Sequence, residues 1–507
     1  MARWRPYLLL AVLAVLPWLP GLFHGFVYDD HGALVENRFW TAPDAWTRVL
    51  TLRTFFETQT LDGQRPTLLA SVLIDRAIGA RDAWHFRLAN IALHAGCVLL
   101  LHAWLLGVLR RAKQPTAAAQ AFVAALLFAL HPLASEAIQV PSYREDVLAL
   151  FWLLGALALS GLPRAAVRAP LQALCFVLAL GAKESAVVLP ALLAAIWWCY
   201  PTERPAVRRG ALEIGVALLL VGGYLALAFA ARPPQALGGE WNGLSLPWPE
   251  NVWTAPWLLL RYLKLLVAPW PLSADRVLAP VPGPLSLYVL IPLLLIVLLL
   301  ALMFFLRRRQ PLAALSLAWV LVCFAPVSNL IPLHNPFADR YAYALVAGFV
   351  LFPAALPLSD RVVRRGLIAL AAAYAILLQL RLPDWRDDAT LWSATLRVEP
   401  RSARAHTGLG LEALGQGDDV TAAWHFTKAD ELNPRDTTAL INLAVMDGRR
   451  DDIAAAAAKL EEAVKRRPDK ADAWANLAVA RELQGRREEA LEAADRAHQL
   501  DPLGRFK

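Results

Sequence analysis

Cysteine is scarce in this sequence. The 507 residues include four cysteines, Cys97, Cys175, Cys199 and Cys323. All four lie inside apolar runs, so the rest of the chain contains no pair that could form a disulfide. Cysteine usage therefore does not identify the redox compartment.

Several catalytic motifs are absent as well. The sequence contains no P-loop, no His/Cys spacing typical of a zinc site and no nucleophilic serine elbow. These absences disfavour cytosolic nucleotide chemistry. We expect no cofactor and no bound metal, although a requirement for a divalent cation stays open.

Charged residues make up only 18% of the chain, whereas 58% are hydrophobic and the mean hydropathy is +0.44. This composition excludes an ordinary soluble protein and predicts a polytopic membrane protein. The charge is uneven: from Asp384 onward there are 19 Lys/Arg and 23 Asp/Glu, against 31 and 19 before it. The basic excess of the first part is best explained by membrane topology, and we expect no nucleic-acid partner.

Eleven apolar stretches are candidate membrane spans, although several are shorter than the usual ~20 residues. They are residues 7–26, 86–109, 117–133, 146–162, 169–181, 185–200, 210–231, 285–306, 311–327, 341–358 and 366–380. Arg3 and Arg5 could begin a signal peptide, but no small-residue cleavage site follows, which favours an uncleaved first span. A further apolar stretch, 252–269, is interpreted as an interfacial or re-entrant helix.

The basic residues between the spans favour one orientation. With eleven crossings, clusters such as Arg110/Arg111 and Arg307–Arg309 all lie inside, so the N terminus is cytoplasmic and the chain after residue 380 is outside. Ionisable segments that topology does not explain then share the outer face. They are Asp29/Asp30, the loop 135–144, Lys183/Glu184, the loop 232–251 and the segment 328–340.

Proline recurs every 34 residues near the C terminus, which is the period of tetratricopeptide repeats. The positions are Pro400, Pro434, Pro468 and Pro502. Small residues such as Gly410, Ala444 and Ala478 recur in register, which lets paired helices approach closely. We expect an all-α chain with a membrane domain at 1–382 and an α-solenoid at 383–507. Whether the repeats recruit a substrate or form a rigid cap or self-association surface stays open.

The stretch "FVYDDHGALVEN" ends the first apolar run with two adjacent carboxylates, Asp29 and Asp30. Adjacent carboxylates repel, which raises the pKa of one or demands a cationic partner. A general base that acts on a hydroxyl would use such a site. The alternative is a solvated span terminus.

The segment His131–Phe151 carries a second cluster of ionisable residues in a short loop. Its members are His131, Glu136, Arg144, Glu145 and Asp146. Arg144 could bind a phosphate oxygen or neutralise the two aspartates, because a guanidinium makes forked contacts with either. The alternative is an interfacial Arg–Glu pair.

Lys183 lies at the outer turn of a helical hairpin, against the positive-inside trend, so it is a candidate phosphate ligand. Neutralisation by Glu184 alone is the alternative. The same outer face receives further cations and hydrogen-bonding groups. They are Arg65, His94, Asp339 and Arg340.

Several of these stretches occur in the order seen in a known family. "FVYDDHGALVEN", "WHFRLANIALH", "HPLASEAIQVPSYRED", "AKES" and "NPFADRYAY", followed by the repeats, resemble the transmembrane and tetratricopeptide-repeat O-mannosyltransferases. That family belongs to the C-type glycosyltransferases (GT-C). The resemblance implies an inverting enzyme that takes a sugar from a polyprenyl-phosphate lipid outside the cytoplasm.

By this resemblance one of Asp29 and Asp30 activates the acceptor hydroxyl, and we prefer Asp29. Charge and topology make Arg144, Lys183 and Arg340 the candidates for the donor phosphate. Candidate sugar contacts or supporting residues are Arg65, His94, His131, Glu136, Glu145, Asp146 and Asp339. The sequence does not specify the base, the metal requirement or the oligomeric state.

The Ala/Leu/Arg-rich composition suggests a bacterial member in the inner (plasma) membrane, with periplasmic repeats. Mannose or another hexose on undecaprenyl phosphate would then be the donor. The acceptor would be protein Ser/Thr hydroxyls, with a glycan or lipid as alternatives. Two other functions stay open, a lipid or sugar transporter and a noncatalytic membrane scaffold that presents the repeats.

Overall fold

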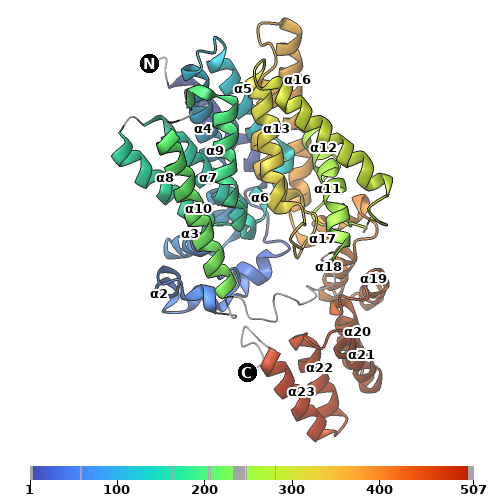
Figure 1. Cartoon of the computed structure of the whole chain (residues 1–507). Helices are drawn as coiled ribbons and strands as arrows, with labels where there is room; N and C mark the ends of the chain where they lie inside the picture. Colours follow the sequence, from blue (N-terminus) through green and yellow to red (C-terminus); the bar gives the residue numbers. More distant parts are fainter. Residues whose placement is uncertain are drawn as a thin grey trace.

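The computed structural model describes residues 4–57, 60–162, 164–203, 205, 207–231, 246, 248–279 and 281–500. Within these ranges every regular element is helical, which confirms the expected all-α class (Figure 1). Arg3, Pro502 and residues 232–245 and 247 of the predicted outer loop lie outside the described residues.

The first part of the chain is a helical bundle (Figure 1). Its helices are α1 (Arg5–Val15), α2 (Ala45–Leu50), α3 (Pro66–Ala77), α4 (Ala83–Arg111), α5 (Ala117–Leu130), α6 (Ser135–Gln139), α7 (Arg144–Ala158), α8 (Ala165–Leu180), α9 (Leu189–Cys199), α10 (Val207–Ala230), α11 (Glu250–Val267), α12 (Leu287–Leu306), α13 (Pro311–Phe324), α14 (Tyr343–Phe349), α15 (Leu351–Ala354) and α16 (Arg361–Arg381). The long helix α4 is apolar on most faces and packs against α1, α5 and α7, as expected of a core helix.

Four described helices are long and apolar enough to cross a membrane. They are Ala83–Arg111, Arg209–Ala230, Leu287–Leu306 and Arg361–Trp385. The pair Ala117–Leu130 and Pro132–Gln139, bent by 52°, would be a fifth span. In Arg209–Ala230 and Leu287–Leu306 only 11% of the apolar window is buried, so their apolar side chains face outward, as in lipid-facing helices. Each of the eleven predicted stretches contains a helix, but eleven crossings stay a prediction.

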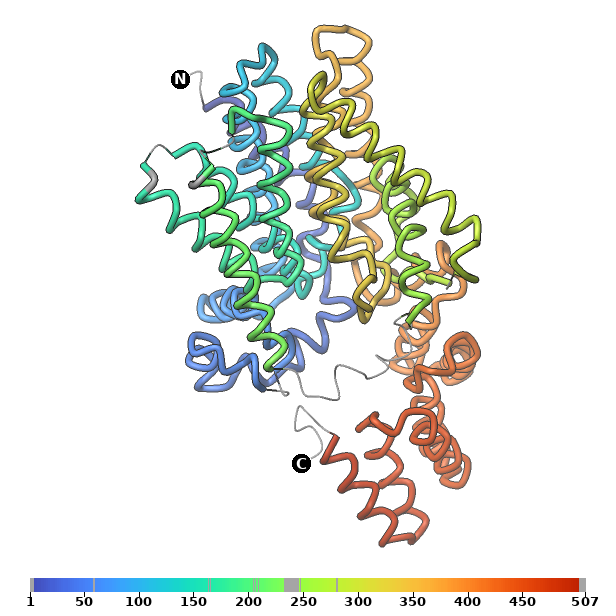
Figure 2. Tube along the Cα trace, viewed as in Figure 1, coloured from blue at the N-terminus to red at the C-terminus, as the bar shows by residue number. Residues whose placement is uncertain are grey.

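The C-terminal part is a stack of helix pairs, drawn orange to red in Figure 2. Its helices are α17 (Asp388–Val398), α18 (Ala403–Gly415), α19 (Asp419–Leu432), α20 (Thr438–Arg449), α21 (Ile453–Arg466), α22 (Ala471–Leu483) and α23 (Arg487–Leu500). The helices pack in pairs, α18 with α19, α20 with α21 and α22 with α23. Side chains cap several of them: Asp418 accepts the backbone N–H of Thr421, and Asp452 accepts that of Ala455.

Close packing of the first pair depends on Gly410 in α18. A Cβ at this position would lie 2.6 Å from the buried ring of Phe426, whereas a Cβ at Gly415 of the same helix would meet nothing within 4 Å. We expect Gly410→Ala to destabilise the repeats by about 1–3 kcal/mol. Gly415→Ala should be neutral or stabilise by up to ~1 kcal/mol. Thermal unfolding of the two variants checks this, and equal melting temperatures would contradict it.

The N terminus and the repeats lie at opposite ends of the bundle. The chain enters α1 at the end far from the repeats, while α2, α3 and α17–α23 lie at the other end (Figures 1 and 2). The candidate site lies at this repeat-side end, where the segment after α1 meets α17 and α18.

Candidate active site

The segment that carries Asp29 and Asp30 has an unusual backbone. Tyr28 has a φ of 58°, in the left-handed region that a tyrosine rarely adopts. A single turn of π-helix, His31–Val35, follows directly. Such a conformation costs about 1–3 kcal/mol and persists only where surrounding contacts hold it.

Those contacts come from the start of the repeat region. The backbone N–H of Tyr28 donates to Asp388 Oδ1 of α17 at 2.8 Å, and the Tyr28 ring lies edge-on to Trp392, with 4.9 Å between centroids. Arg404 of α18 donates to the Tyr28 hydroxyl and to Asp275 Oδ1, the latter at 2.9 Å. Helices α17 and α18 therefore fix the turn that presents Asp29.

The two aspartates have different surroundings. Asp30 is fully buried, and its oxygens accept the backbone N–H groups of Val27 at 3.1 Å and Ser142 at 2.8 Å. Burial raises the pKa of Asp30 to about 6. Asp29 is exposed, and its Oδ2 accepts the hydroxyl of Tyr143 at 2.5 Å. Asp30 thus anchors the loop, while Asp29 remains accessible to a ligand.

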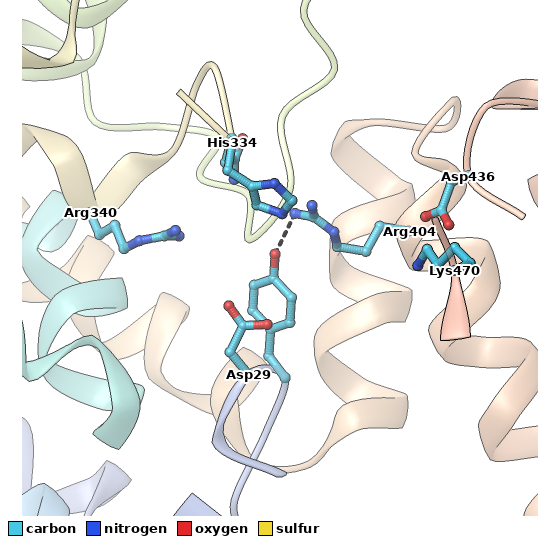
Figure 3. A pocket seen from close by; sticks show the side chains of 8 residues that line it. Asp29, His334, Arg340, Arg404, Asp436 and Lys470 are labelled. Carbon is cyan, nitrogen blue, oxygen red and sulfur yellow. Dashed lines mark hydrogen bonds between the residues drawn. The ribbon is translucent and has the colours of Figure 1, made fainter. Parts of the chain in front are cut away.

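A pocket of about 220 Å³ lies in front of Asp29 (Figure 3). It is lined by Tyr28, Asp29, His334, Asn335, Arg340, Arg404, Asp436 and Lys470. Sites that enclose drug-sized ligands measure ~300–1,000 Å³, so this pocket suits a smaller polar group. Residues of the bundle and of the repeats form its walls together.

Arg340 is held rigidly in the bundle-side wall. Its Nη1 donates to Glu136 Oε1 at 2.6 Å and its backbone N–H to Glu136 Oε2 at 2.8 Å. The guanidinium lies 3.8 Å from the centroid of the Tyr143 ring. Two buried nitrogens in this wall, Arg340 Nε and Asn335 Nδ2, have no hydrogen-bond partner among the described residues. The wall therefore offers donors that suit an anionic oxygen.

The structure brings Asp29 and Arg340 to one pocket but not the other two predicted phosphate ligands. Arg144 is buried against Asp75 at 2.6 Å and donates to Asn90 Oδ1 at 2.7 Å. Lys183 pairs with Asp146 at 2.6 Å and with Glu145 at 3.7 Å. Both cations are already neutralised away from the pocket.

The remaining predicted residues support the framework. Arg65 pairs with Glu184 at 3.0 Å and lies 3.6 Å from Glu145. His94 and His131 are buried, hydrogen-bonded to Tyr343 at 2.8 Å and to the Leu266 carbonyl at 3.1 Å. Asp339 pairs with Arg276 at 2.6 Å, and neither residue lines the pocket. Glu136 pairs with Arg340 and reaches the pocket only through that arginine. In the described part of the chain, no group of three or more His, Cys, Asp and Glu side chains could hold a metal ion.

Sequence reasoning missed most of the pocket. Tyr28, His334 and Asn335 neighbour the predicted acids and Arg340, and their closeness in sequence was a signal. Arg404, Asp436 and Lys470 come from the repeats, which no local pattern connects to Asp29.

The His31–Asp388 contact should make the loop sensitive to pH. His31 Nε2 lies 2.6 Å from Asp388 Oδ2, and this hydrogen bond raises the pKa of His31 above its ordinary 6.5. A raised folded pKa gives stability that is full below pH 6.5 and is lost as pH rises through the folded value. We expect amide exchange at residues 24–36, corrected for intrinsic rates, to be faster at pH 9 than at pH 5.5. In His31→Gln this difference should shrink, and an unchanged difference would contradict the assignment.

Comparisons with known proteins support part of the sequence interpretation. The tetratricopeptide-repeat family matches residues 471–503, which include α22 and α23. A Caenorhabditis elegans protein named protein O-mannosyl-transferase is 23% identical over an alignment of 451 residues, and the alignment covers 85% of this chain. The aligned part spans 63% of that relative's length. The chain is therefore a repeat-containing protein similar to a protein O-mannosyl-transferase.

A solved structure was also matched, the crystal structure of the APC/C hetero-tetramer Cut9-Hcn1. It is 12% identical, and the match covers 94% of this chain and 95% of the other. The TM-score is 0.23, at which the likeness carries no argument about fold or function.

Proposed function

We propose that this chain is an integral-membrane glycosyltransferase of the GT-C type. It moves a sugar, mannose or another hexose, from a polyprenyl-phosphate donor to an acceptor hydroxyl on the extracytoplasmic side. The observation that carries the proposal is that a carboxylate, Asp29, and a cation, Arg340, line one small pocket at the repeat-side end of the bundle. The likeness to a protein named protein O-mannosyl-transferase supports protein Ser/Thr hydroxyls as the acceptor.

In the proposed reaction Asp29 removes the proton of the acceptor hydroxyl. The acceptor oxygen then attacks the anomeric carbon from the face opposite the phosphate, and the bond between that carbon and the phosphate oxygen breaks. The products are an inverted glycoside and the lipid phosphate. Arg340 and Asn335 stabilise the charge that develops on the leaving phosphate, because both line the pocket and each has a side-chain nitrogen without a hydrogen-bond partner among the described residues.

The proposal assigns separate tasks to the other predicted residues. Asp30 is a positioning residue that holds the loop, and Arg144 and Lys183 stabilise the framework through Asp75 and Asp146. Residues 1–382 form the transferase domain and residues 383–507 the repeat domain. The protein crosses the inner membrane several times, with its N terminus in the cytoplasm.

One observation favours a second candidate, a lipid or sugar transporter. The 52° bend between Ala117–Leu130 and Pro132–Gln139 is the kind of broken helix that transporters use at their binding sites. A transporter would move the lipid-linked sugar without forming a glycosylated product.

A comparison of glycoproteomes from cells with and without this protein tests the proposal. We expect a set of hexose-modified Ser/Thr peptides from extracytoplasmic proteins to be lost in its absence. Restoring the wild-type gene should restore them. Identical sets in both cells would contradict a protein acceptor and favour transport or a scaffold role.

A further inference from the structure

Three charged side chains of the repeat region form one wall of the pocket. Arg404 lies in α18, Asp436 precedes α20 and Lys470 precedes α22. Figure 3 shows them across the pocket from Arg340, with Lys470 and Asp436 at the far side. A ligand group in this pocket would therefore be in reach of both the bundle and the repeats.

Two of these three side chains have structural tasks. Arg404 pairs with the buried Asp275, which also accepts the Ser402 hydroxyl at 2.6 Å. Asp436 accepts the backbone N–H of Thr438 at 3.1 Å and its hydroxyl at 2.6 Å, which shapes its own turn. These contacts account for Arg404 and Asp436 without any ligand.

Lys470 is different. It is half-buried at the pocket, and within the described residues its ammonium makes no ion pair and no hydrogen bond. A cation that lines a pocket and makes no contact with a carboxylate is available to bind an incoming anion.

The charges around the pocket also favour an anionic ligand. The pKa of His334 is lowered, chiefly by burial and then by Arg404, with Arg340 and Lys470 adding to the effect and Asp29 opposing it. The potential at the His334 side chain is thus net positive, which attracts anionic groups toward the pocket.

The repeat geometry extends this site. Ser402, Asp436 and Lys470 are spaced by one repeat length of 34 residues, so they occupy equivalent turns at the starts of α18, α20 and α22. Solenoids bind extended polypeptides along such rows of equivalent positions. Ser402 is fully buried, whereas Asp436 and Lys470 line the pocket, so a polypeptide bound at these two positions would pass Lys470 with a neighbouring side chain near Asp29.

We propose that Lys470 binds a carboxylate of the acceptor, so that the acceptor is a polypeptide segment with an acidic residue within a few positions of the modified Ser or Thr. This inference rests on the proposed transfer to a hydroxyl at Asp29. Lys470 is then a specificity-determining residue of the repeat domain, and the donor phosphate remains with Arg340.

The test uses the full chain in detergent, with polyprenyl-phosphate mannose and glucose as donors. The acceptors are Ser/Thr peptides that differ only in Asp or Lys residues within three positions of the hydroxyl. The wild type should prefer the acidic peptide about fivefold or more, in binding measured by fluorescence anisotropy and in transfer. Lys470→Glu should reverse this preference. Lys465→Glu, an exposed lysine outside the pocket, should leave it unchanged.

The outcomes separate the two proposals. Charge-dependent binding with no transfer would support the Lys470 site and contradict the transferase. Transfer by the wild type with a peptide preference that Lys470→Glu does not change would overturn the Lys470 site alone. A third outcome would also overturn the Lys470 site. If Lys470→Glu lowers transfer to all peptides equally and raises the KM for the donor, Lys470 binds the donor phosphate and not the acceptor.

Discussion

Asp29→Asn should lower sugar transfer by about 100- to 10,000-fold, the usual contribution of a general base. The amide cannot take the proton of the acceptor hydroxyl, whereas its size still fits beside the Tyr143 hydroxyl. Because Asp29 is exposed and its carboxylate accepts only that hydroxyl among the described residues, folding stability should change little. The variant should therefore combine a lost kcat with a nearly unchanged melting temperature.

Asp30→Asn is the informative comparison. The Asn side chain would place its NH₂ group against the backbone N–H of Val27 or of Ser142, where Asp30 accepts a hydrogen bond. Because two donors then face each other, the loop should loosen and the melting temperature should fall. Glu36→Gln, an exposed carboxylate a few residues further on, should affect neither quantity. Full activity in Asp29→Asn with loss confined to Asp30→Asn would assign the base to Asp30 instead.

Arg340→Gln should lower kcat/KM for the lipid-linked donor by about 100-fold or more, because it removes the cation nearest the leaving phosphate. It also leaves Glu136, which is 1% exposed, without its partner, and such losses cost about 3–5 kcal/mol of stability. Stability alone would then lower the measured activity. A second variant is needed to separate the two effects.

The double variant Glu136→Gln/Arg340→Gln provides that separation. It removes the buried charge as well as its partner, so the melting temperature should recover toward that of the wild type. Transfer should stay low, with a raised KM for the donor, because Glu136 does not line the pocket whereas Arg340 does. Recovery of transfer together with stability would show that Arg340 only balances Glu136.

Part of this site could be predicted from the sequence. Asp29 and Arg340 both lie at span ends on the face that positive-inside counting assigns to the exterior, and the structure brings them to one pocket. The same reasoning could not separate Arg340 from Arg144 and Lys183. Charge and topology are alike for all three, and only the packing shows that Asp75 and Asp146 neutralise the latter two.

The repeat-side wall could not be predicted. Arg404 lies 376 residues from Tyr28 along the chain, and nothing in the sequence around either residue records their contact. The left-handed backbone of Tyr28 was also hidden, because tyrosine has no preference for that conformation and the contacts that hold it come from Asp388 and Arg404.

The fold, too, could be predicted only in part from the sequence. Hydropathy located a helix in every predicted stretch because apolar runs of this length form helices in either core or lipid. The helix break near the end of the predicted span 117–133 could also be predicted, because the sequence has a proline, Pro132, directly after His131. The stretch 252–269 corresponds to α11, which packs against α12 and α14, a neighbourhood that its composition could not specify.

Transfer from a labelled polyprenyl-phosphate sugar to a Ser/Thr peptide by the purified full chain tests the central claim most directly. The account predicts that the wild type labels the peptide, that the new glycosidic bond has the anomeric configuration opposite to that of the donor, and that Asp29→Asn gives almost no product. Equal labelling by the wild type and Asp29→Asn, or no labelling by the wild type from either mannose or glucose donors, would contradict it.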